Sequence, residues 1–186
     1  MKNERKIKMY SHNEEQPSVI IKIKEDQYLF QEFIKIHLKN LQELQLQSQQ
    51  KKLVVGLPYV FDQEVLKAFF NVPIFFVLTK DSGIDRIYKA NLNSVYNKKV
   101  DEKKFFHQFD LLLPNEKRFY TPKRFNSCVV IDSIIEIYPC DFMKLIEGAP
   151  YWCGNKNGRK FEIYNFCHTR ENRCYVTYNS KYRKYN

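Results

Sequence analysis

The sequence contains no apolar stretch of the length that a membrane-spanning helix requires. Such a helix needs about 20 predominantly apolar residues, and polar or charged residues interrupt every hydrophobic run of this 186-residue chain much earlier. The first residues, MKNERKIKMYSHNEEQ, are polar, so we expect no secretory signal peptide. With only 5 glycines and 7 prolines, a low-complexity chain is excluded. The length then suits one domain, or a small domain with an arm.

Cysteine is also scarce, with 5 residues and no tight repeat. In the absence of a signal peptide, we expect reduced thiols in a nuclear or cytosolic protein. A C-x13-CH-x5-C spacing is formed by Cys153, Cys167, His168 and Cys174. Zinc sites usually use ligand pairs separated by about two to four residues, and neighbours such as Cys167 and His168 point to opposite faces of a strand. We therefore predict neither metal nor cofactor, although the sequence leaves open whether this group binds metal.

Acidic residues are outnumbered, with 21 Asp and Glu against 31 Lys and Arg, which gives a formal net charge of +10. A basic excess attracts nucleic acid, nucleosomes or anionic surfaces through counterion release and electrostatic steering. The charge therefore favours a nucleic-acid or chromatin setting, although a merely solvated basic surface would have the same composition.

Recognisable enzyme motifs are missing, because the chain has no P-loop, no GxGxxG and no HExxH. Asp132 and Glu136 share one face of a predicted strand, but their spacing is more typical of a polar outer face than of a catalytic pair. We therefore predict that the protein is not an enzyme. A metal- or histidine-dependent nuclease that uses His107 or His168 is the least favoured alternative.

The first part of the chain predicts an arm followed by a larger domain. We expect residues 1–17 to be disordered and residues 18–70 to form a strand and helices that pack on the main domain. Alternation in SVIIKIK predicts a strand over 18–24. Asp26 can begin a helix, and a further short helix is expected over 63–70. One face of the first helix carries an apolar stripe of Phe30, Phe33, Ile34, Leu38 and Leu41.

Short apolar segments separated by polar turns predict a β-rich domain over residues 71–168. Its strands are expected at 73–79, 86–96, 104–113, 128–138, 151–153 and 159–166, and 53–61 before the domain is expected to be a strand or an extended segment. DFMKLIEG (141–148) is expected to form one helical turn or a loop before Gly148. The predicted fold class is α+β, mainly an antiparallel β barrel or sheet with an N-terminal helical arm. Residues 169–186 are expected to form a basic, tyrosine-rich tail.

The order of several segments resembles the bromo-adjacent homology (BAH) domain family. The segments that carry this resemblance are RIYKANLNSVY (86–96), KRFYT (117–121), CVVIDSIIEIY (128–138), DFMKLIEG (141–148) and YWCGNKNGRKFEI (151–163). The resemblance covers about half of the chain. It implies a BAH-like β-domain in a nuclear, chromatin-associated protein that binds a histone tail, a nucleosome or a protein subunit of a larger complex.

The resemblance also implies a possible site for methylated lysine, since some members of the family read this modification with an aromatic cage. A cage holds the ammonium group through cation–π attraction to two or three ring faces. The candidates by position in this sequence are Phe106, Phe109, Tyr120 and Phe125. Plain core packing of these rings is the alternative.

Two basic clusters with interleaved aromatic residues are candidate nucleic-acid contacts, because cations bind phosphates and flat rings stack on bases. The first cluster contains Lys117, Arg118, Lys123 and Arg124. The second contains Arg170, Arg173, Lys181, Arg183 and Lys184. We therefore expect a non-enzymatic chromatin-binding or assembly module with basic contacts to nucleic acid, and no membrane or small-molecule partner. An RNA- or single-stranded-DNA-binding β-barrel subunit of a ribonucleoprotein is the alternative.

Overall fold

Eight strands of the computed structural model form one mixed sheet in the order β2-β5-β4-β3-β1-β8-β6-β7. The structure describes residues 18–23, 27–45, 52–58, 60, 72–118, 124–153, 156–168 and 174–177. The strands are β1 Ser18–Ile23, β2 Leu53–Leu57, β3 Pro73–Lys80, β4 Gly83–Asn97, β5 Ser127–Ile137, β6 Pro150–Cys153, β7 Lys156–Lys160 and β8 Cys174–Thr177. The described helices are α1 Gln27–Gln45, α3 Glu102–Asp110, α4 Pro114–Lys117, α5 Pro139–Ile146 and α6 Ile163–His168.

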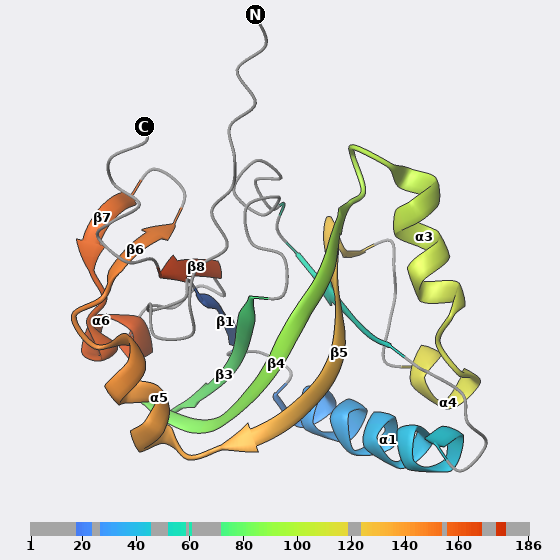
Figure 1. Ribbon diagram of the computed structural model, residues 1–186, viewed down its shortest axis with the longest axis horizontal. Helices are drawn as coiled ribbons and strands as arrows, with labels where there is room; N and C mark the ends of the chain where they lie inside the picture. The colour runs from blue at the N-terminus through green and yellow to red at the C-terminus, as the bar shows by residue number, and fades with distance from the viewer. Residues whose placement is uncertain are drawn as a thin grey trace, which may run out of the picture.

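Neighbouring strands are antiparallel except for β1 and β3, which run parallel. The order ends at β2 on one side and at β7 on the other, so the described strands form an open sheet and not a closed barrel. The predicted α+β class with a mainly antiparallel sheet is confirmed at this level. Figure 1 shows that the sheet is strongly bent, with α5 and α6 at one end and α3 and α4 at the other.

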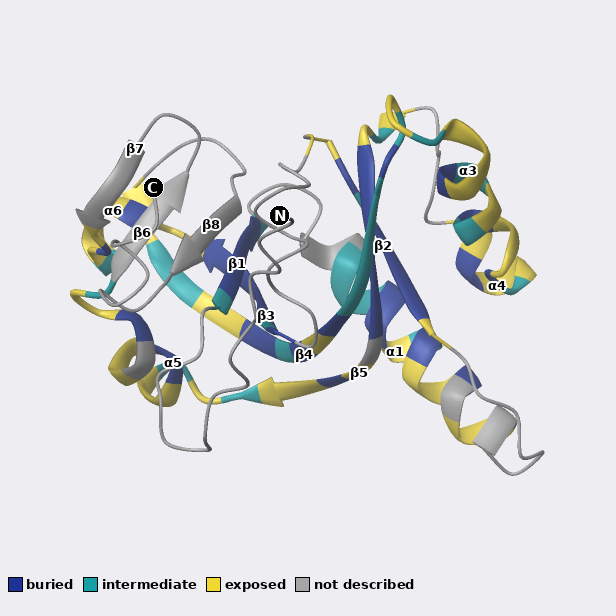
Figure 2. Ribbon diagram, turned by 45° about the horizontal axis from the view of Figure 1, so that its top comes forward, coloured by how far each residue is buried: buried dark blue, intermediate teal, exposed yellow. Residues whose placement is uncertain are grey.

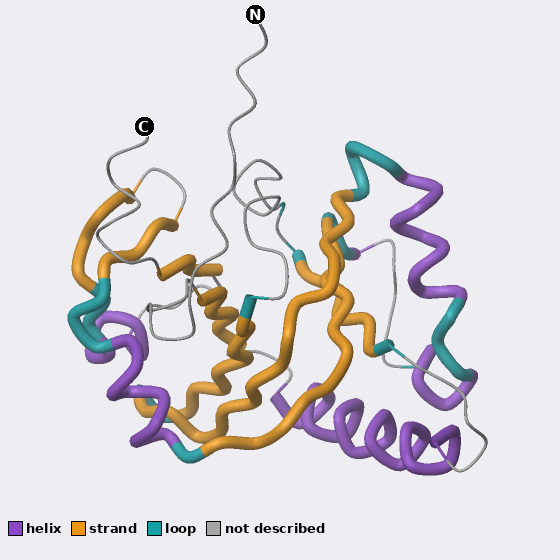
Figure 3. The backbone as a smooth tube through the Cα atoms, in the orientation of Figure 1, coloured by secondary structure: helices purple, strands orange, loops and turns teal. Residues whose placement is uncertain are grey.

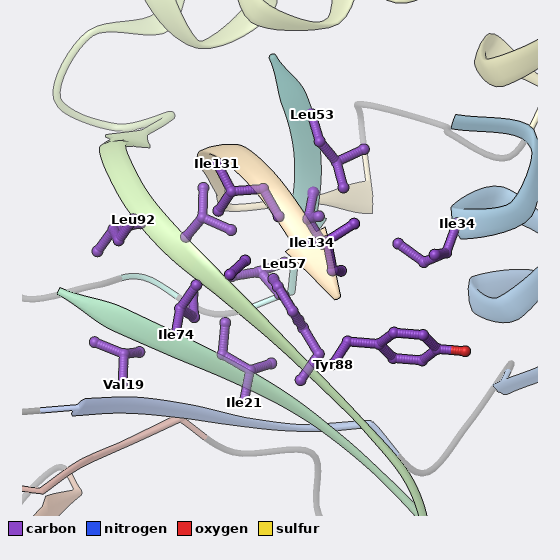
Figure 4. Close-up of a cluster of buried hydrophobic side chains, with 14 of the residues drawn as sticks. Val19, Ile21, Ile34, Leu53, Leu57, Ile74, Tyr88, Leu92, Ile131 and Ile134 are labelled. Atoms are coloured by element: carbon purple, nitrogen blue, oxygen red, sulfur yellow. The ribbon is translucent and has the colours of Figure 1, made fainter. Parts of the chain in front are cut away.

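One face of the bent sheet encloses the largest apolar cluster. Alternate residues of β1, β3, β4, β5 and β2 contribute to this cluster, and Phe33 and Ile34 of α1 pack on it. Figure 4 shows these side chains gathered between β1 and β3 on one side and β2 and β5 on the other. Phe30 of α1 adds ring contacts, with its centroid 5.4 Å from that of Phe76 and 6.0 Å from that of Tyr88. Helix α1 therefore closes this core through Phe30, Phe33 and Ile34 of its predicted apolar stripe, whereas Leu38 is exposed and the side chain of Leu41 is not described.

Strand β1 lies inside the sheet, between β3 and β8. Val19 and Ile21 join the cluster under α1, while Ile20 joins a second cluster beneath α5 and α6 on the opposite face. Burial on both faces explains why the segment is an almost continuous apolar run. An arm made of residues 18–70 is therefore an incomplete description, because β1 and β2 are strands of the same sheet as β3 to β7. The predicted tail likewise contains β8, which pairs with β1 and β6.

Lys22 is a buried cation in this apolar setting, with 1% of its surface exposed. Its Nζ donates hydrogen bonds to the backbone oxygens of Phe166 and Cys167 at the C-terminal end of α6. Nζ also lies 5.2 Å from the ring centroid of Phe166. Carbonyl groups at a helix C-terminus carry partial negative charge, so these hydrogen bonds join β1 to α6.

Two segments that the sequence assigns to strands are helical. Residues 104–113 were expected to be a strand, but Glu102–Asp110 forms α3, which is drawn as a helix in Figure 3. The side chain of Asp101 accepts a hydrogen bond from the backbone N–H of Lys104 at 3.0 Å and begins the helix. The expected strand over 159–166 is also wrong beyond Lys160, because Ile163–His168 forms α6. Phe105, Phe109 and Leu112 are buried four and three positions apart, and partly buried Ile163 lies three and four positions before buried Phe166 and Cys167. Such spacing is helical.

Other predicted elements are confirmed with small changes at their ends. They include β1, α1, β2, β3, β4, β5 and β6, and α5 extends the single turn that was expected before Gly148. The turn between β3 and β4 contains Asp81 and Ser82, both with positive φ. Such a two-residue turn matches the twist of a hairpin. The predicted helix over 63–70 and the predicted disorder over 1–17 lie outside the described residues.

Gly56 of β2 marks a close approach between the sheet and Phe125. A Cβ atom added to Gly56 would lie 2.4 Å from Cδ2 and 2.7 Å from Cγ of the Phe125 ring. The ring therefore occupies the space of a side chain, and it holds the segment before β5 against the edge strand.

We expect the substitution Gly56→Ala to lower the free energy of unfolding by about 1–3 kcal/mol, as overpacking of a filled core does. Chemical denaturation of the variant measures this loss. The double variant with Phe125→Val should recover part of this loss, because valine leaves room for the Cβ atom added at position 56. Equal stability of Gly56→Ala and the original protein would contradict the packing described for Phe125.

Candidate nucleic-acid interface

Helix α3 lies on the sheet at its β2 and β5 side through one apolar face. Phe105, Phe109 and Leu112 are buried against a cluster that includes Val54 of β2 and Val130 of β5. Phe105 and Phe109 lie one turn apart on the same side of α3, and Leu112 follows directly after the end of the helix. Figure 2 shows the opposite side of α3 and the adjoining α4 as mostly exposed. The anchored face therefore holds α3 in place and turns its polar face to solvent.

The predicted cage residues within the described chain belong to this packing. Phe109 and Phe125 stack with centroids 6.1 Å apart and planes inclined by 8°. Phe105 meets Phe109 edge-on at 5.1 Å and Phe106 at 5.2 Å, while Lys98 Nζ lies 5.3 Å from the Phe106 centroid. The structure thus places Phe109 against Phe125, while Phe106 contacts Phe105 and Lys98. Tyr120 lies outside the described residues, so the cage stays a prediction.

Helix α4 is joined to α1 by buried polar side chains. The ring N–H at Nδ1 of His37 donates to Glu116 Oε1 at 2.9 Å, and 1% and 0% of these two side chains are exposed. Glu116 Oε2 also accepts the backbone N–H of Leu113 at 2.8 Å. Beside this pair, the amides of Asn40 and Asn115 exchange two hydrogen bonds of 3.0 Å. These contacts determine where α4 lies, and Lys117 and Arg118 follow Glu116 directly.

Exposed cations gather on α3, on α4 and in the segments beside them. We call this set the basic layer, and its members are Lys99, Lys103, Lys104, Lys117, Arg118 and Arg124. The exposed carboxylates of α3 are Glu102 and Asp110. Asp101, which caps α3, interacts with Lys104, whose Nζ lies 3.1 Å from Asp101 Oδ2. Hydrogen bonds from the backbone N–H and the side chain of Lys104 lower the pKa of Asp101. The surface charge of the layer is therefore positive.

The sequence identified part of this layer. Lys117, Arg118 and Arg124 were predicted as nucleic-acid contacts and are exposed. Lys99, Lys103 and Lys104 were missed, because 97–103 was read as a polar loop and 104–113 as a strand. The capping position of Asp101 before an apolar spacing of four and three residues was the signal that could have revealed them. The other predicted contacts lie outside the described residues: Lys123, Arg170, Arg173, Lys181, Arg183 and Lys184.

Two of the four possible metal ligands, Cys167 and His168, have described side chains. Cys167 is buried, and His168 is exposed with its Nδ1 2.8 Å from the backbone oxygen of Tyr164. The side chains of Cys153 and Cys174 are not described. In the described residues, no three His, Cys, Asp or Glu side chains gather as a metal site would require. The question of metal binding by this group therefore stays open.

Comparison with known proteins finds no family model, no curated protein and no solved structure that matches this chain. The resemblance to BAH domains is therefore a prediction that these comparisons do not support. None of the helices described here combines the length and the apolar character needed to cross a membrane.

The pair of His37 and Glu116 predicts a non-additive effect on stability. Glu116→Leu should lower the free energy of unfolding by about 2–4 kcal/mol, because it leaves the His37 N–H and the Leu113 N–H without their acceptor. The double variant His37→Leu with Glu116→Leu should be more stable than the sum of the single losses implies. Equilibrium urea unfolding of the four proteins measures this coupling, and strictly additive losses would contradict a direct interaction.

The cysteines should differ in reactivity towards an alkylating reagent. Burial raises the pKa of the Cys128 thiol to about 12, whereas Cys140 is exposed. The thiolate is the reactive form, so Cys140 should be alkylated at neutral pH while Cys128 reacts only after unfolding. Peptide mapping by mass spectrometry measures both rates. Equal labelling of the two residues in the folded protein would be inconsistent with the burial of Cys128.

Proposed function

We propose that this chain is a non-enzymatic nuclear module that docks on chromatin, with the basic layer contacting nucleic acid. The observation that carries the proposal is the basic layer itself, in which exposed cations lie on helices whose opposite faces are fixed to the sheet and to α1. Cations held on a fixed frame lose less conformational freedom on binding than cations on a mobile chain. A rigid array of positive charge matches the phosphates of nucleic acid.

Binding is favoured over catalysis by the placement of the polar groups. In the described part of the chain, His37 and Glu116 form the pair that most resembles an acid–base dyad, yet at most 1% of either side chain is exposed. A substrate atom would have to come within hydrogen-bonding distance of the base, and buried groups give it no approach. Their contacts support a structural role between α1 and α4.

The described rings favour nucleic acid over a histone tail as the partner. A cage needs ring faces that point to a common open space, and the faces of Phe109 and Phe125 are stacked on each other. We therefore assign the docking to charge, with a histone tail or a protein subunit as an additional partner.

Titration with nucleosomes and with free DNA over a range of salt concentrations tests the proposal. We expect binding to both at low salt. The triple variant Lys103→Gln, Lys117→Gln, Arg118→Gln should reduce the slope of log affinity against log salt by about two to three, since each lost phosphate contact contributes about 0.9. Lys104 is retained because of its ion pair with Asp101.

The matched control removes three exposed charges from β3, α5 and β7, through Lys80→Gln, Lys144→Gln and Lys160→Gln. This control has the same net charge as the test variant and should keep most of the affinity. Equal losses in the two variants would show that net charge, and not the basic layer, governs binding. An absence of binding to nucleosomes and to DNA at low salt would refute the proposed function.

A further inference from the structure

We infer that the basic layer binds the phosphate backbone of double-stranded DNA and does not stack the bases of a single strand. This inference rests on the proposed function and specifies its ligand. Proteins that bind single strands combine a positive groove with aromatic rings on which successive bases stack, each worth about 1–3 kcal/mol. A protein that binds the duplex backbone needs cations, because the bases of a duplex are already stacked on each other.

The rings that the structure describes beside the basic layer contact one another or Lys98. Phe109 stacks on Phe125, Phe105 packs edge-on against both Phe106 and Phe109, and Phe105 and Phe109 are buried. Lys98 Nζ lies over the face of Phe106. Displacing Phe125 to free a ring face would open the space above Gly56 that it fills. Base stacking at this surface would therefore disrupt the cluster that holds α3 on the sheet.

Large exposed rings occur elsewhere in the described chain. Tyr138 and Tyr164 are 77% and 71% exposed, and they lie at the start of α5 and in α6. Figure 1 shows these helices at the end of the sheet opposite α3 and α4. Tyr164 also stacks on His168, with centroids 4.0 Å apart. Among the described residues, which do not include 119–123, the exposed aromatic rings and the basic layer are thus separated, whereas a strand-binding groove requires them to be interleaved.

The dimensions of the layer suit a duplex. Helix α3 has 9 residues, which corresponds to a length of roughly 13 Å. Duplex DNA carries one charge per about 1.7 Å of its axis, so this length spans several phosphates. Lys103 and Lys104 are exposed at the beginning of α3, and Lys117 and Arg118 are exposed at the end of α4. The cations of the layer thus lie on more than one helix, and a stiff duplex can present several phosphates to them.

The test compares a duplex of about 20 base pairs with each of its separated strands, using full-length protein and fluorescence anisotropy between about 50 and 200 mM salt. The protein should bind the duplex about tenfold more tightly than either strand. The salt slope should also be steeper for the duplex, as its higher charge density requires. The triple variant at Lys103, Lys117 and Arg118 should lose this preference, whereas the control at Lys80, Lys144 and Lys160 should retain it.

The possible outcomes distinguish a failure of the duplex inference from a failure of the proposed function. Single strands bound as tightly as the duplex, or more tightly, would overturn the inference and leave nucleic-acid docking intact. A duplex preference that the triple variant retains would also overturn it, because another surface would then be responsible. Failure to bind the duplex, the single strands and nucleosomes at low salt would refute the proposed function itself. Circular dichroism of the triple variant verifies that it is folded.

Discussion

Burial of the central strands on both faces is the constraint on which the rest of the structure depends. β1 pairs in parallel with β3 and antiparallel with β8, and Val19, Ile20 and Ile21 are at most 1% exposed. A strand with two apolar faces must be covered on both sides. Helix α1 covers one face, and α5, α6 and Phe161 cover the other. The bend of the sheet follows from this arrangement, because one apolar cluster is enclosed between its two ends.

The basic layer derives its position from the same core. The face of β5 opposite the α1 core supplies Cys128 and Val130 to the cluster beneath α3, so α3 rests on a strand that the main core already holds. Helix α4 is tied to α1 by His37 and Glu116. A buried pair of this kind adds little net stability when intact, but losing one partner is costly. The cations that follow Glu116 therefore lie where the α1 core places them.

The sequence predicted the elements whose patterns are local. Val- and Ile-rich runs identified β3 and β5, and the apolar stripe identified α1. The parallel pairing of β1 with β3 could not be predicted, because no local signal connects strands that are separated by α1 and β2. Helix α3 was misread because KFFHQFDLLL is rich in phenylalanine and leucine, and such short apolar runs suit either structure. The consequence for the site was direct: Lys117, Arg118 and Arg124 were predicted as contacts, while Lys103 was assigned to a polar loop and Lys104 to a strand.

The docking surface that we propose is a positively charged helical layer held in place by the sheet and by α1. Hydrogen–deuterium exchange of this chain, with and without duplex DNA, examines that surface residue by residue, because exchange reports local protection along the chain. DNA should slow exchange over residues 98–118 and 124–127. Protection confined to α5 and α6, or to segments outside the basic layer, would contradict it.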